Sequence, residues 1–444
     1  MKLLAVAGEI TSLIAGIRLV TPLQVLIALH GGSLVLRSLH DCAQVDLAAA
    51  DVLVLQRGAS ANAWRLQQAM RLRGGAVVAE IDDLLTDLPA HISNHVAVRA
   101  QRQWVERCLR TADVVSVSTA RLSLELRAEL GIANTCIVPN SAFSLGDLPL
   151  PPVQAGQPVH LLLAAMDQWS APWLMPALHM IHSPGVQIVV VGPAAGLFAA
   201  AGLGVQAHPL MPRSQFIEMA RSLPNPLAVI PLDDSRFAAC KSAIKWFEYG
   251  EAGVPVLCSD VSPYREVIEQ GVTGKLVANN AAAWAQALRQ AVASADWRQR
   301  TAQAARAVVR QRHAPAHTVA AWQVALAQAL AQRAAARVPP AVVAWRLQAA
   351  LQAALEPAEP YRRRTRALHA ARAGADQAPA RADDFFEPGP PHHRAQSCRS
   401  RRAGGGYPVP QPVAHRADRG AGAVAAGAGR NHCRGDCRIG YRRQ

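Results

Sequence analysis

Residues 227–260, LAVIPLDDSRFAACKSAIKWFEYGEAGVPVLCSD, constrain the fold more than any other stretch of the chain. Two short apolar runs, 227–232 and 255–259, flank a polar loop and a helix-like segment that starts near Lys241. Two buried strands joined by a helix form a crossover unit, whose strands run parallel. Ligands of such sheets bind beyond the carboxyl ends of the strands. We therefore expect a parallel α/β fold with a binding site in this stretch.

The same alternation of short apolar runs and amphipathic segments continues through most of the 444 residues, a length that allows two or three domains. A proline-rich linker at 149–158 separates two such series, which predicts two Rossmann-like domains facing across a cleft, at 1–148 and 159–335. The remaining strands are expected at residues 3–7, 33–36, 51–56, 76–81, 114–118, 136–139, 159–165, 186–191 and 205–208. Helices are expected at 62–73, 120–130, 172–181 and 212–223, and C-terminal helices at 281–336.

Lys241, Lys245 and Glu248 are spaced i, i+4 and i+7, so one face of the expected helix carries all three. Two cations beside the free N–H groups at a helix start form a site for a diphosphate, and a carboxylate one turn deeper can accept hydrogen bonds from ribose hydroxyls. The alternative is a solvated face of lysine and glutamate. The chain holds only four lysines among 46 cationic residues, which favours the phosphate site.

The segment from Lys241 to Val277, KSAIKWFEYGEAGVPVLCSDVSPYREVIEQGVTGKLV, resembles the donor-binding segment of the GT-B glycosyltransferases of group 1, the family-4-like enzymes that include those of bacterial cell-surface polysaccharides. In that family a Lys-rich helix start, a Glu before a small-residue turn, and Pro-Tyr-x-Glu form the nucleotide-sugar pocket. The resemblance implies an N-terminal acceptor domain and a C-terminal donor domain. Its implied donor-binding residues are Lys241, Ser242, Lys245, Glu248 and Gly253, with Tyr264 and Glu266 in the cleft.

One position departs from the family pattern. Many retaining relatives carry a glutamate that contacts the donor sugar eight residues before the one matched by Glu248, and here that position is Cys240. Asp233 and Asp234, at the end of the preceding strand, could partly substitute for it and are counted with the donor-binding residues. Retention of anomeric configuration is therefore an expectation that rests on the family.

Asp82 and Asp83 follow directly after the strand expected at 76–81. At the carboxyl end of a parallel strand they could bind an acceptor sugar or act as a catalytic base, whereas the alternative makes Asp83 a helix N-cap. Three further residues are candidates for the cleft. His91 lies in the next loop, and Arg18 and His208 resemble family positions in the first loop and near the donor base.

The net charge of +15 would suggest a nucleic acid or membrane partner, but residues 361–444 account for +11 of it. We interpret this low-complexity tail, rich in Arg, Gly, Pro and Ala, as disordered or frame-shifted, and residues 336–360 as a helical extension. No specific nucleic acid is expected. Glu9 and Arg18 interrupt the apolar N-terminus, so a cytoplasmic protein is expected, or one peripheral to the inner membrane.

The sequence predicts a glycosyltransferase that moves a sugar from a nucleotide diphosphate sugar to a glycan or lipid-linked acceptor in surface polysaccharide synthesis. The resemblance implies a retaining reaction. No Asp-x-Asp metal motif is present, so neither a metal ion nor another cofactor is expected besides the donor substrate. The alternative is a non-catalytic homologue that acts as a nucleotide-binding or scaffold module.

Overall fold

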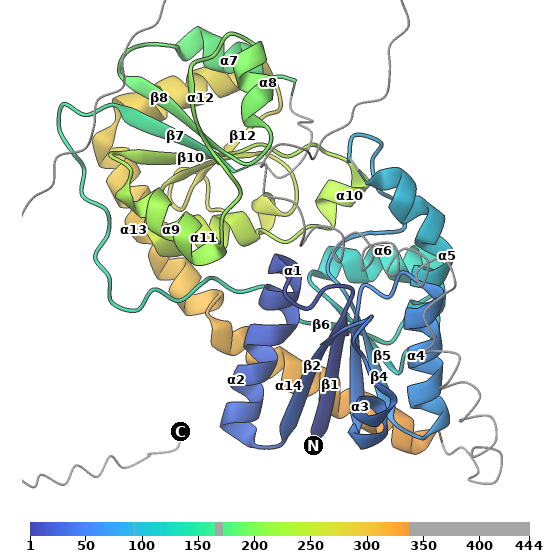
Figure 1. Cartoon of the computed structure of the whole chain (residues 1–444). Coiled ribbons are helices and arrows are strands. Elements are labelled where there is room, and N and C mark those ends of the chain that lie inside the picture. The colour runs from blue at the N-terminus through green and yellow to red at the C-terminus, as the bar shows by residue number, and fades with distance from the viewer. Residues whose placement is uncertain (93, 165–171, 337–444) are drawn as a thin grey trace, which may run out of the picture. The chain divides into compact units, whose positions relative to one another are not determined.

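Two parallel six-stranded sheets, each flanked by helices, form the body of the protein (Figure 1). The structure is a computed structural model, and it describes residues 1–92, 94–164 and 172–336. The expected α/β class with two Rossmann-like domains is confirmed. The predicted extension from 337 onward and the tail at 361–444 lie outside the described residues.

The first sheet has the strand order β2-β1-β3-β4-β5-β6, so the chain switches direction between β1 and β3. Its central strands are buried on both faces because helices cover both sides, which explains their continuous apolar runs. The strands are β1 (Lys2–Ala7), β2 (Ser33–Ser38), β3 (Val52–Gln56), β4 (Ala76–Ile81), β5 (Val114–Val117) and β6 (Thr135–Ile137).

The second sheet has the order β12-β11-β10-β7-β8-β9, the doubly wound arrangement in which the switch point lies between β7 and β10. Residues 149–158, between the two sheets, contain neither helix nor strand. The strands are β7 (Val159–Ala164), β8 (Val186–Val191), β9 (Val205–His208), β10 (Pro226–Ile230), β11 (Val256–Ser259) and β12 (Lys275–Val277).

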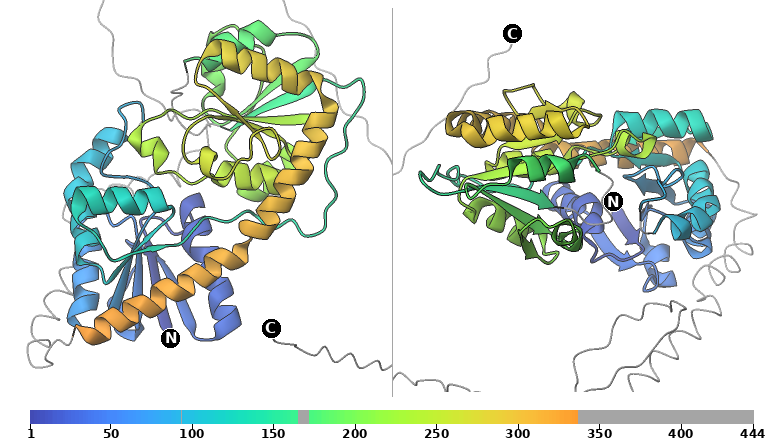
Figure 2. Two further views of the ribbon diagram at one scale, coloured as in Figure 1. Left: turned by 180° about the vertical axis from the view of Figure 1, so that it is seen from behind. Right: turned by 90° about the horizontal axis from the view of Figure 1, so that it is seen from above.

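Helices connect successive strands and bury an apolar face against one sheet or the other (Figure 2). Ser60, Thr119 and Asn280 each cap a helix start through a side-chain oxygen, as polar residues before an apolar period predict. The helices of the first half are α1 (Leu13–Ala15), the π-helix η1 (Gly16–Val20), α2 (Thr21–His30), α3 (Gln44–Ala49), α4 (Ala61–Leu72), α5 (His95–Thr111) and α6 (Ala120–Leu130).

The last helix of the second half packs on the first domain. Helix α14 (Pro315–Ala335) crosses to the first sheet, where its residues Val319, Trp322 and Leu326 join the same buried cluster as β1 and α2 (Figure 2). Trp322 Nε1 also donates a hydrogen bond to the carbonyl of Arg18, at 3.0 Å. The helices are α7 (Leu174–Ile181), α8 (Ala195–Ala200), α9 (Arg213–Ser222), α10 (Arg236–Ala239), α11 (Ile244–Ala252), the 3-10 helix η2 (Tyr264–Glu266), α12 (Ala281–Ala293), α13 (Ala295–Arg312) and α14 (Pro315–Ala335).

Four details differ from the sequence predictions. Helix α11 begins at Ile244 rather than near Lys241, and the preceding loop holds the short helix α10, which the sequence analysis missed. Helix α5 was also missed, although its first residue, His95, follows the loop that holds His91. No helix begins at Leu84, so the N-cap alternative for Asp83 is wrong.

Candidate functional site

The switch point of the second sheet holds Lys245. This residue is the second of α11, and its Nζ donates to the carbonyl oxygen of Ala164, at the end of β7, over 2.5 Å. The start of α11 provides backbone N–H groups without intrahelical partners. Burial, with a smaller contribution from Lys241, lowers the pKa of the Lys245 ammonium to about 8. An anion that binds beside such a lysine stabilises its charged form and offsets the cost of burying the ammonium.

Lys241 lies in the loop before α11, so the prediction that one helix face carries both lysines and Glu248 is wrong. Its Nζ is 3.1 Å from Asp83 Oδ1, and it also lies over the ring of Phe237, 4.3 Å from the centroid. The carboxyl end of the first sheet therefore contacts the loop that precedes α11. Lys241 has a carboxylate partner where the sequence predicts a diphosphate.

Glu248 is paired with Arg213, the first residue of α9, at 2.5 Å. Arg213 in turn donates from Nη2 to the carbonyl of Ser141 at 3.0 Å, which ties it to the segment that follows β6. Burial raises the pKa of Glu248 even though Arg213 opposes the shift. The carboxylate is thus placed one turn into the helix, as predicted, but one of its oxygens is already engaged.

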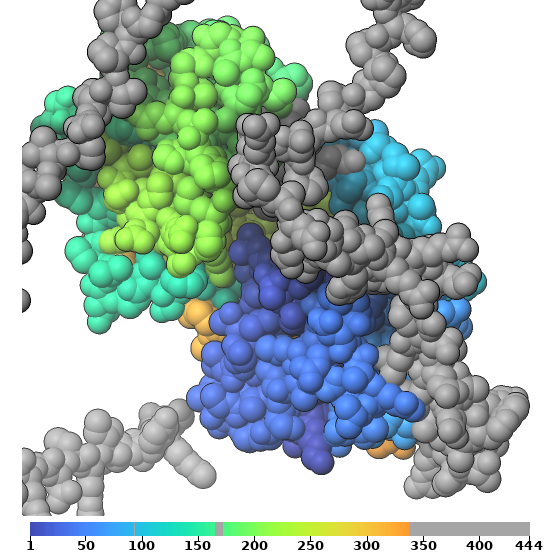
Figure 3. Space-filling model, viewed as in Figure 1, coloured from blue at the N-terminus to red at the C-terminus, as the bar shows by residue number. Residues whose placement is uncertain are grey.

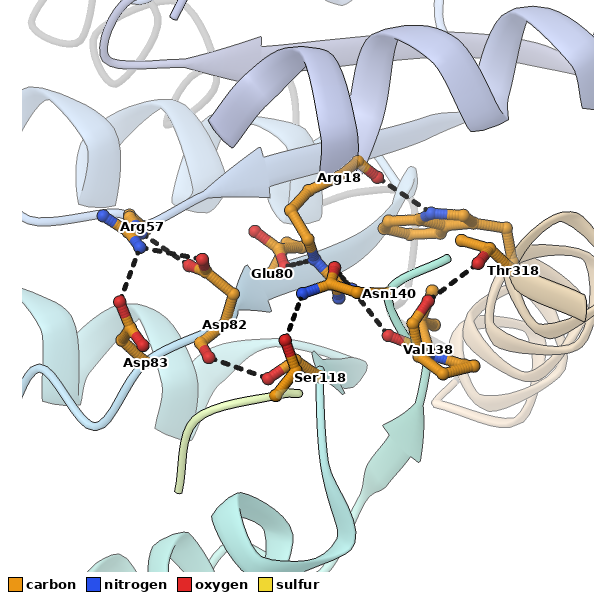
Figure 4. Close-up of polar contacts among 12 residues, drawn as sticks. Arg18, Arg57, Glu80, Asp82, Asp83, Ser118, Val138, Asn140 and Thr318 are labelled. Carbon is orange, nitrogen blue, oxygen red and sulfur yellow. Dashed lines mark hydrogen bonds and ion pairs between the residues drawn. The ribbon is translucent and has the colours of Figure 1, made fainter. Parts of the chain in front are cut away.

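Asp82 and Asp83 follow β4, and Arg57, which follows β3, holds both (Figure 4). Arg57 donates to the two oxygens of Asp82 at 2.6 and 2.8 Å and to Asp83 Oδ2 at 3.0 Å. Burial would raise the pKa of Asp83, but Lys241 and Arg57 outweigh it and lower the pKa. Asp83 is therefore an ionised counter-ion to two cations, which makes it a poor base.

Arg57 has a backbone φ of 46°, a left-handed conformation that residues other than glycine rarely adopt. Such strain concentrates at functional sites, where the surrounding contacts hold it in place. Here the bidentate pair with Asp82 supplies those contacts. Arg57 was not predicted from the sequence, where its one signal is a cation directly after a buried strand.

A second network lies beside the first and links both domains (Figure 4). Arg18, only 1% exposed, donates to Glu80 at 2.7 Å, to the carbonyl of Val138 at 2.6 Å and to Asn140 Oδ1 at 2.9 Å. Asn140 Nδ2 then donates to Ser242 Oγ at 2.7 Å, between the two lysines. Arg18 was predicted to line the cleft. The structure corrects this, because its guanidinium is buried in a structural ion pair.

The two aspartates proposed to replace the missing glutamate lie beyond β10. Asp233 Oδ2 is 3.5 Å from His91 Nε2, so the structure brings together two residues that were predicted separately. Asp234 is exposed. Cys240 is fully buried and belongs to the apolar cluster of the first domain, together with Phe237 of α10. The side chain at this position therefore packs in a core and does not face a donor sugar.

Three of the predicted site residues, Gly253, Tyr264 and His208, are placed elsewhere, whereas Glu266 is linked through Ser262 to the carbonyl of Ala239, just before Lys241. Gly253 is the left-handed C-cap of α11, at the opposite end of the helix from Lys245, and a Cβ there would lie 2.5 Å from a Leu150 methyl carbon. Tyr264 is buried in the second core. Exposed Glu266 accepts a hydrogen bond from Ser262 at 2.8 Å. His208 ends the edge strand β9, away from the β7/β10 switch point.

A pocket of about 180 Å³ opens at the switch point of the first sheet. The ends of β1 and β3 and the start of α4 surround it. It is lined by Ala7, Gly8, Leu39, Leu55, Gln56, Arg57, Gly58, Ala59, Ser60, Ala63 and Gln101. Arg57 therefore touches both the pocket and the acidic pair, and the amides and hydroxyl of the lining can hydrogen-bond a polar ligand.

Comparison with known proteins supports the fold. Residues 242–308 match the model of the group 1 glycosyl transferases. Sucrose-phosphate synthase from Thermosynechococcus elongatus has a TM-score of 0.56 and 15% identity, over 76% of this chain and all of its own. A Rickettsia africae glycosyltransferase has a TM-score of 0.54 and 14% identity, over 74% and 98%. Anabaena HepE in complex with UDP-glucose has a TM-score of 0.51 and 16% identity, over 76% and 100%.

No curated protein sequence matches the chain. The fold is that of the GT-B glycosyltransferases, and the resemblance seen at 241–277 is confirmed by the group 1 match, which begins at Ser242. Lys241 thus lies immediately before the matched segment, and Lys245 and Glu248 lie within it.

Proposed function

We propose that this protein is a glycosyltransferase that takes a sugar from a nucleoside diphosphate sugar. Lys245 at the β7/β10 switch point, beside the start of α11, carries the proposal. Its ammonium and that of Lys241 would neutralise the diphosphate as negative charge develops on the leaving group. Glu248 would receive the ribose hydroxyls through the oxygen that Arg213 leaves free. UDP sugars are the first donors to test, since HepE binds UDP-glucose.

The pocket beside Arg57 supports an acceptor site in the first domain. Gln56, Ser60 and Gln101 in its lining can hydrogen-bond hydroxyl groups, and Arg57 links the pocket to Asp82 and Asp83 at the carboxyl end of the sheet. We assign to it a glycan or lipid-linked saccharide, as surface polysaccharide synthesis requires. Asp82 would fix the Arg57 side chain that holds the acceptor. The attacking acceptor hydroxyl would pass its proton to the phosphate oxygen that departs from the donor sugar.

The proposal includes retention of configuration and no metal ion. Two lysines supply the positive charge that a divalent cation would otherwise bring. Retention rests on the resemblance to retaining relatives. Nuclear magnetic resonance of the first product formed would test it, because an inverted anomer contradicts retention. Activity in the presence of a chelator would test metal independence.

Replacing Lys241 provides the direct test of the donor site. Lys241→Ala removes one of two cations from the phosphate region, so the affinity for the donor nucleotide should fall at least about tenfold. Calorimetry with UDP and UDP-glucose measures it. Lys275→Ala is the matched control, since this lysine lies on β12 and bonds to Gln290 at the surface. Unchanged affinity in Lys241→Ala would reject the phosphate role.

A non-catalytic nucleotide-binding module is the second candidate function, and buried Cys240 favours it. It stands where many retaining relatives place the glutamate that contacts the sugar. Hydrolysis of a panel of nucleotide sugars separates the two functions. A transferase releases some nucleoside diphosphate without acceptor, whereas a scaffold binds the nucleotide and releases none.

We further propose a cytoplasmic location with attachment at a membrane surface. The helical segment Leu13–His30 is the one described segment long and apolar enough to cross a membrane, and 33% of it is buried in the protein. It forms part of the surface of the first domain (Figure 3). Leu13 and Leu29 are 45% and 68% exposed there. Flotation with liposomes tests attachment, and Leu29→Gln should weaken it.

A further inference from the structure

Residues 236–242, here called the docking loop, lie between β10 and α11 of the second domain but are fixed to the first domain. Phe237 and Cys240 belong to the apolar cluster of the first domain, and the carbonyl of Cys240 accepts a hydrogen bond from Thr119 Oγ1 at 2.9 Å. Arg236 pairs with two glutamates of α6, at 2.6 and 2.7 Å. The docking loop therefore belongs to the first domain by its contacts.

Lys241, in this loop, is held by two side chains. Its ammonium is 3.1 Å from Asp83 Oδ1, and it lies over the ring of Phe237, 4.3 Å from the centroid. The ion pair is partly buried, since 34% of the Lys241 side chain and 20% of the Asp83 side chain are exposed. Lys245, in contrast, is fixed to β7 of the second domain through the carbonyl of Ala164. The two lysines that would bind a diphosphate are thus held by different domains.

Asp83 has a second cation that allows it to release the first. Arg57 Nη2 donates to Asp83 Oδ2 at 3.0 Å, whereas Lys241 binds the other oxygen. Arg57 is fixed in turn by both oxygens of Asp82. A partly buried carboxylate that loses its only cation is unfavourable, but Asp83 would keep Arg57 when Lys241 leaves. A diphosphate carries more negative charge than one carboxylate, so it can displace Asp83 from the ammonium.

We propose that Asp83 is a positioning residue of the donor site. Its carboxylate holds Lys241 on the first domain until a nucleoside diphosphate displaces it, so that two anions compete for one ammonium. This role rests on the proposed function, in which Lys241 contacts the donor diphosphate. A diphosphate that takes over Lys241 would contact the docking loop and Lys245 at once. It would thereby link the two domains, which in its absence are joined here through Asp83.

Calorimetry with UDP tests the competition. Asp83→Asn keeps the shape of the side chain and removes the competing charge, so UDP should bind about three to five times more tightly than to the wild type. In the Lys241→Ala protein the same replacement should give a much smaller gain, because the shared ammonium is gone. Asp87→Asn is the matched control, since Asp87 lies in the same loop, is 53% exposed and pairs with Arg236. UDP should bind this variant as it binds the wild type.

Acylation of the lysine amines supplies a second readout that needs no nucleotide. The chain has only four lysines, so mass spectrometry can follow each of them. Asp83→Asn should speed the acylation of Lys241, because an amine without a carboxylate partner is less protonated. It should leave the rate at Lys275, which bonds to Gln290, unchanged, whereas an unfolded variant would react faster at both.

The outcomes separate this role from the proposed function. If UDP does not bind the wild type, or binds Lys241→Ala equally well, the donor site itself is rejected and the role of Asp83 with it. If UDP binding requires Lys241 but Asp83→Asn does not tighten it, only the competition is rejected. An equal gain with and without Lys241, or an unchanged acylation rate at Lys241 in Asp83→Asn, would also overturn the competition.

Discussion

Replacing Arg18 by Met should destabilise the protein far more at alkaline than at acidic pH. Arg18 and Glu80 are 1% exposed each and 2.7 Å apart, so the variant leaves a buried carboxylate without its cation. The cheapest response of Glu80 is to bind a proton. Protonation costs about 1.4 kcal/mol for each pH unit above the unfolded-state pKa.

That unfolded-state pKa is 4.5, so the cost is about 1.4 kcal/mol near pH 5.5 and nearly 5 kcal/mol near pH 8. Burial already raises the pKa of Glu80 in the wild type, which makes the difference, about 3 kcal/mol, an upper bound. The sign follows from the raised folded-state pKa: stability is kept at low pH and lost as pH rises. The lost hydrogen bonds to Val138 and Asn140 add a part that does not depend on pH.

Urea-induced unfolding of the wild type and the variant at both pH values measures this difference. The double variant Arg18→Met/Glu80→Gln is the control, because it has no carboxylate left to titrate and its deficit should be the same at both pH values. An equal loss of stability at both pH values in the single variant would refute the reasoning. In that case Glu80 would have found water or another partner once the arginine was gone.

Two further predictions concern the second domain. The affinity of the wild type for UDP should fall as pH rises through about 8, where the Lys245 ammonium loses its proton. The Lys245→Arg variant should bind UDP equally across that range, because arginine keeps its charge. Calorimetry in a pH series measures both affinities, and a flat wild-type profile would contradict the assignment. Gly250→Ala should cost about 1–3 kcal/mol, because its Cβ would lie 2.8 Å from a Val309 methyl carbon where α11 meets α13. Adding Val309→Ala should restore part of that loss in thermal denaturation, and no recovery would place the strain elsewhere.

The strands were predictable because a strand buried on both faces has a continuous run of apolar residues, as residues 3–7 and 52–55 show. The start of α11 was not, because the lysine spacing fits a helix that in fact begins at Ile244. The polar loop before it folds as α10 and docks on the first domain through Phe237. Propensity does not reveal such docking.

Residue pairs of the site were harder to predict than its members. Arg57 meets Asp82 because β3 and β4 are neighbours, and the strand order is a property of the whole sheet. Arg213 reaches Glu248 from a different helix. Neither pair has a local signature, so the sequence located the acidic residues and left out the arginines that hold them. The prediction that Gly253 contacts the donor was wrong for a related reason. A helix C-cap and a close approach to a ligand both favour glycine, so the residue type does not distinguish them.

The crossing of α14 has a consequence for the order in which the chain can mature during synthesis. Domains generally fold from the N-terminus as they leave the ribosome. Here the first domain cannot complete its core early, because Trp322 and Leu326 belong to that core and Trp322 is synthesised 304 residues after Arg18. Until then the apolar face of β1 and α2 is uncovered. We therefore expect a nascent chain of this protein to need protection from chaperones until α14 has been synthesised.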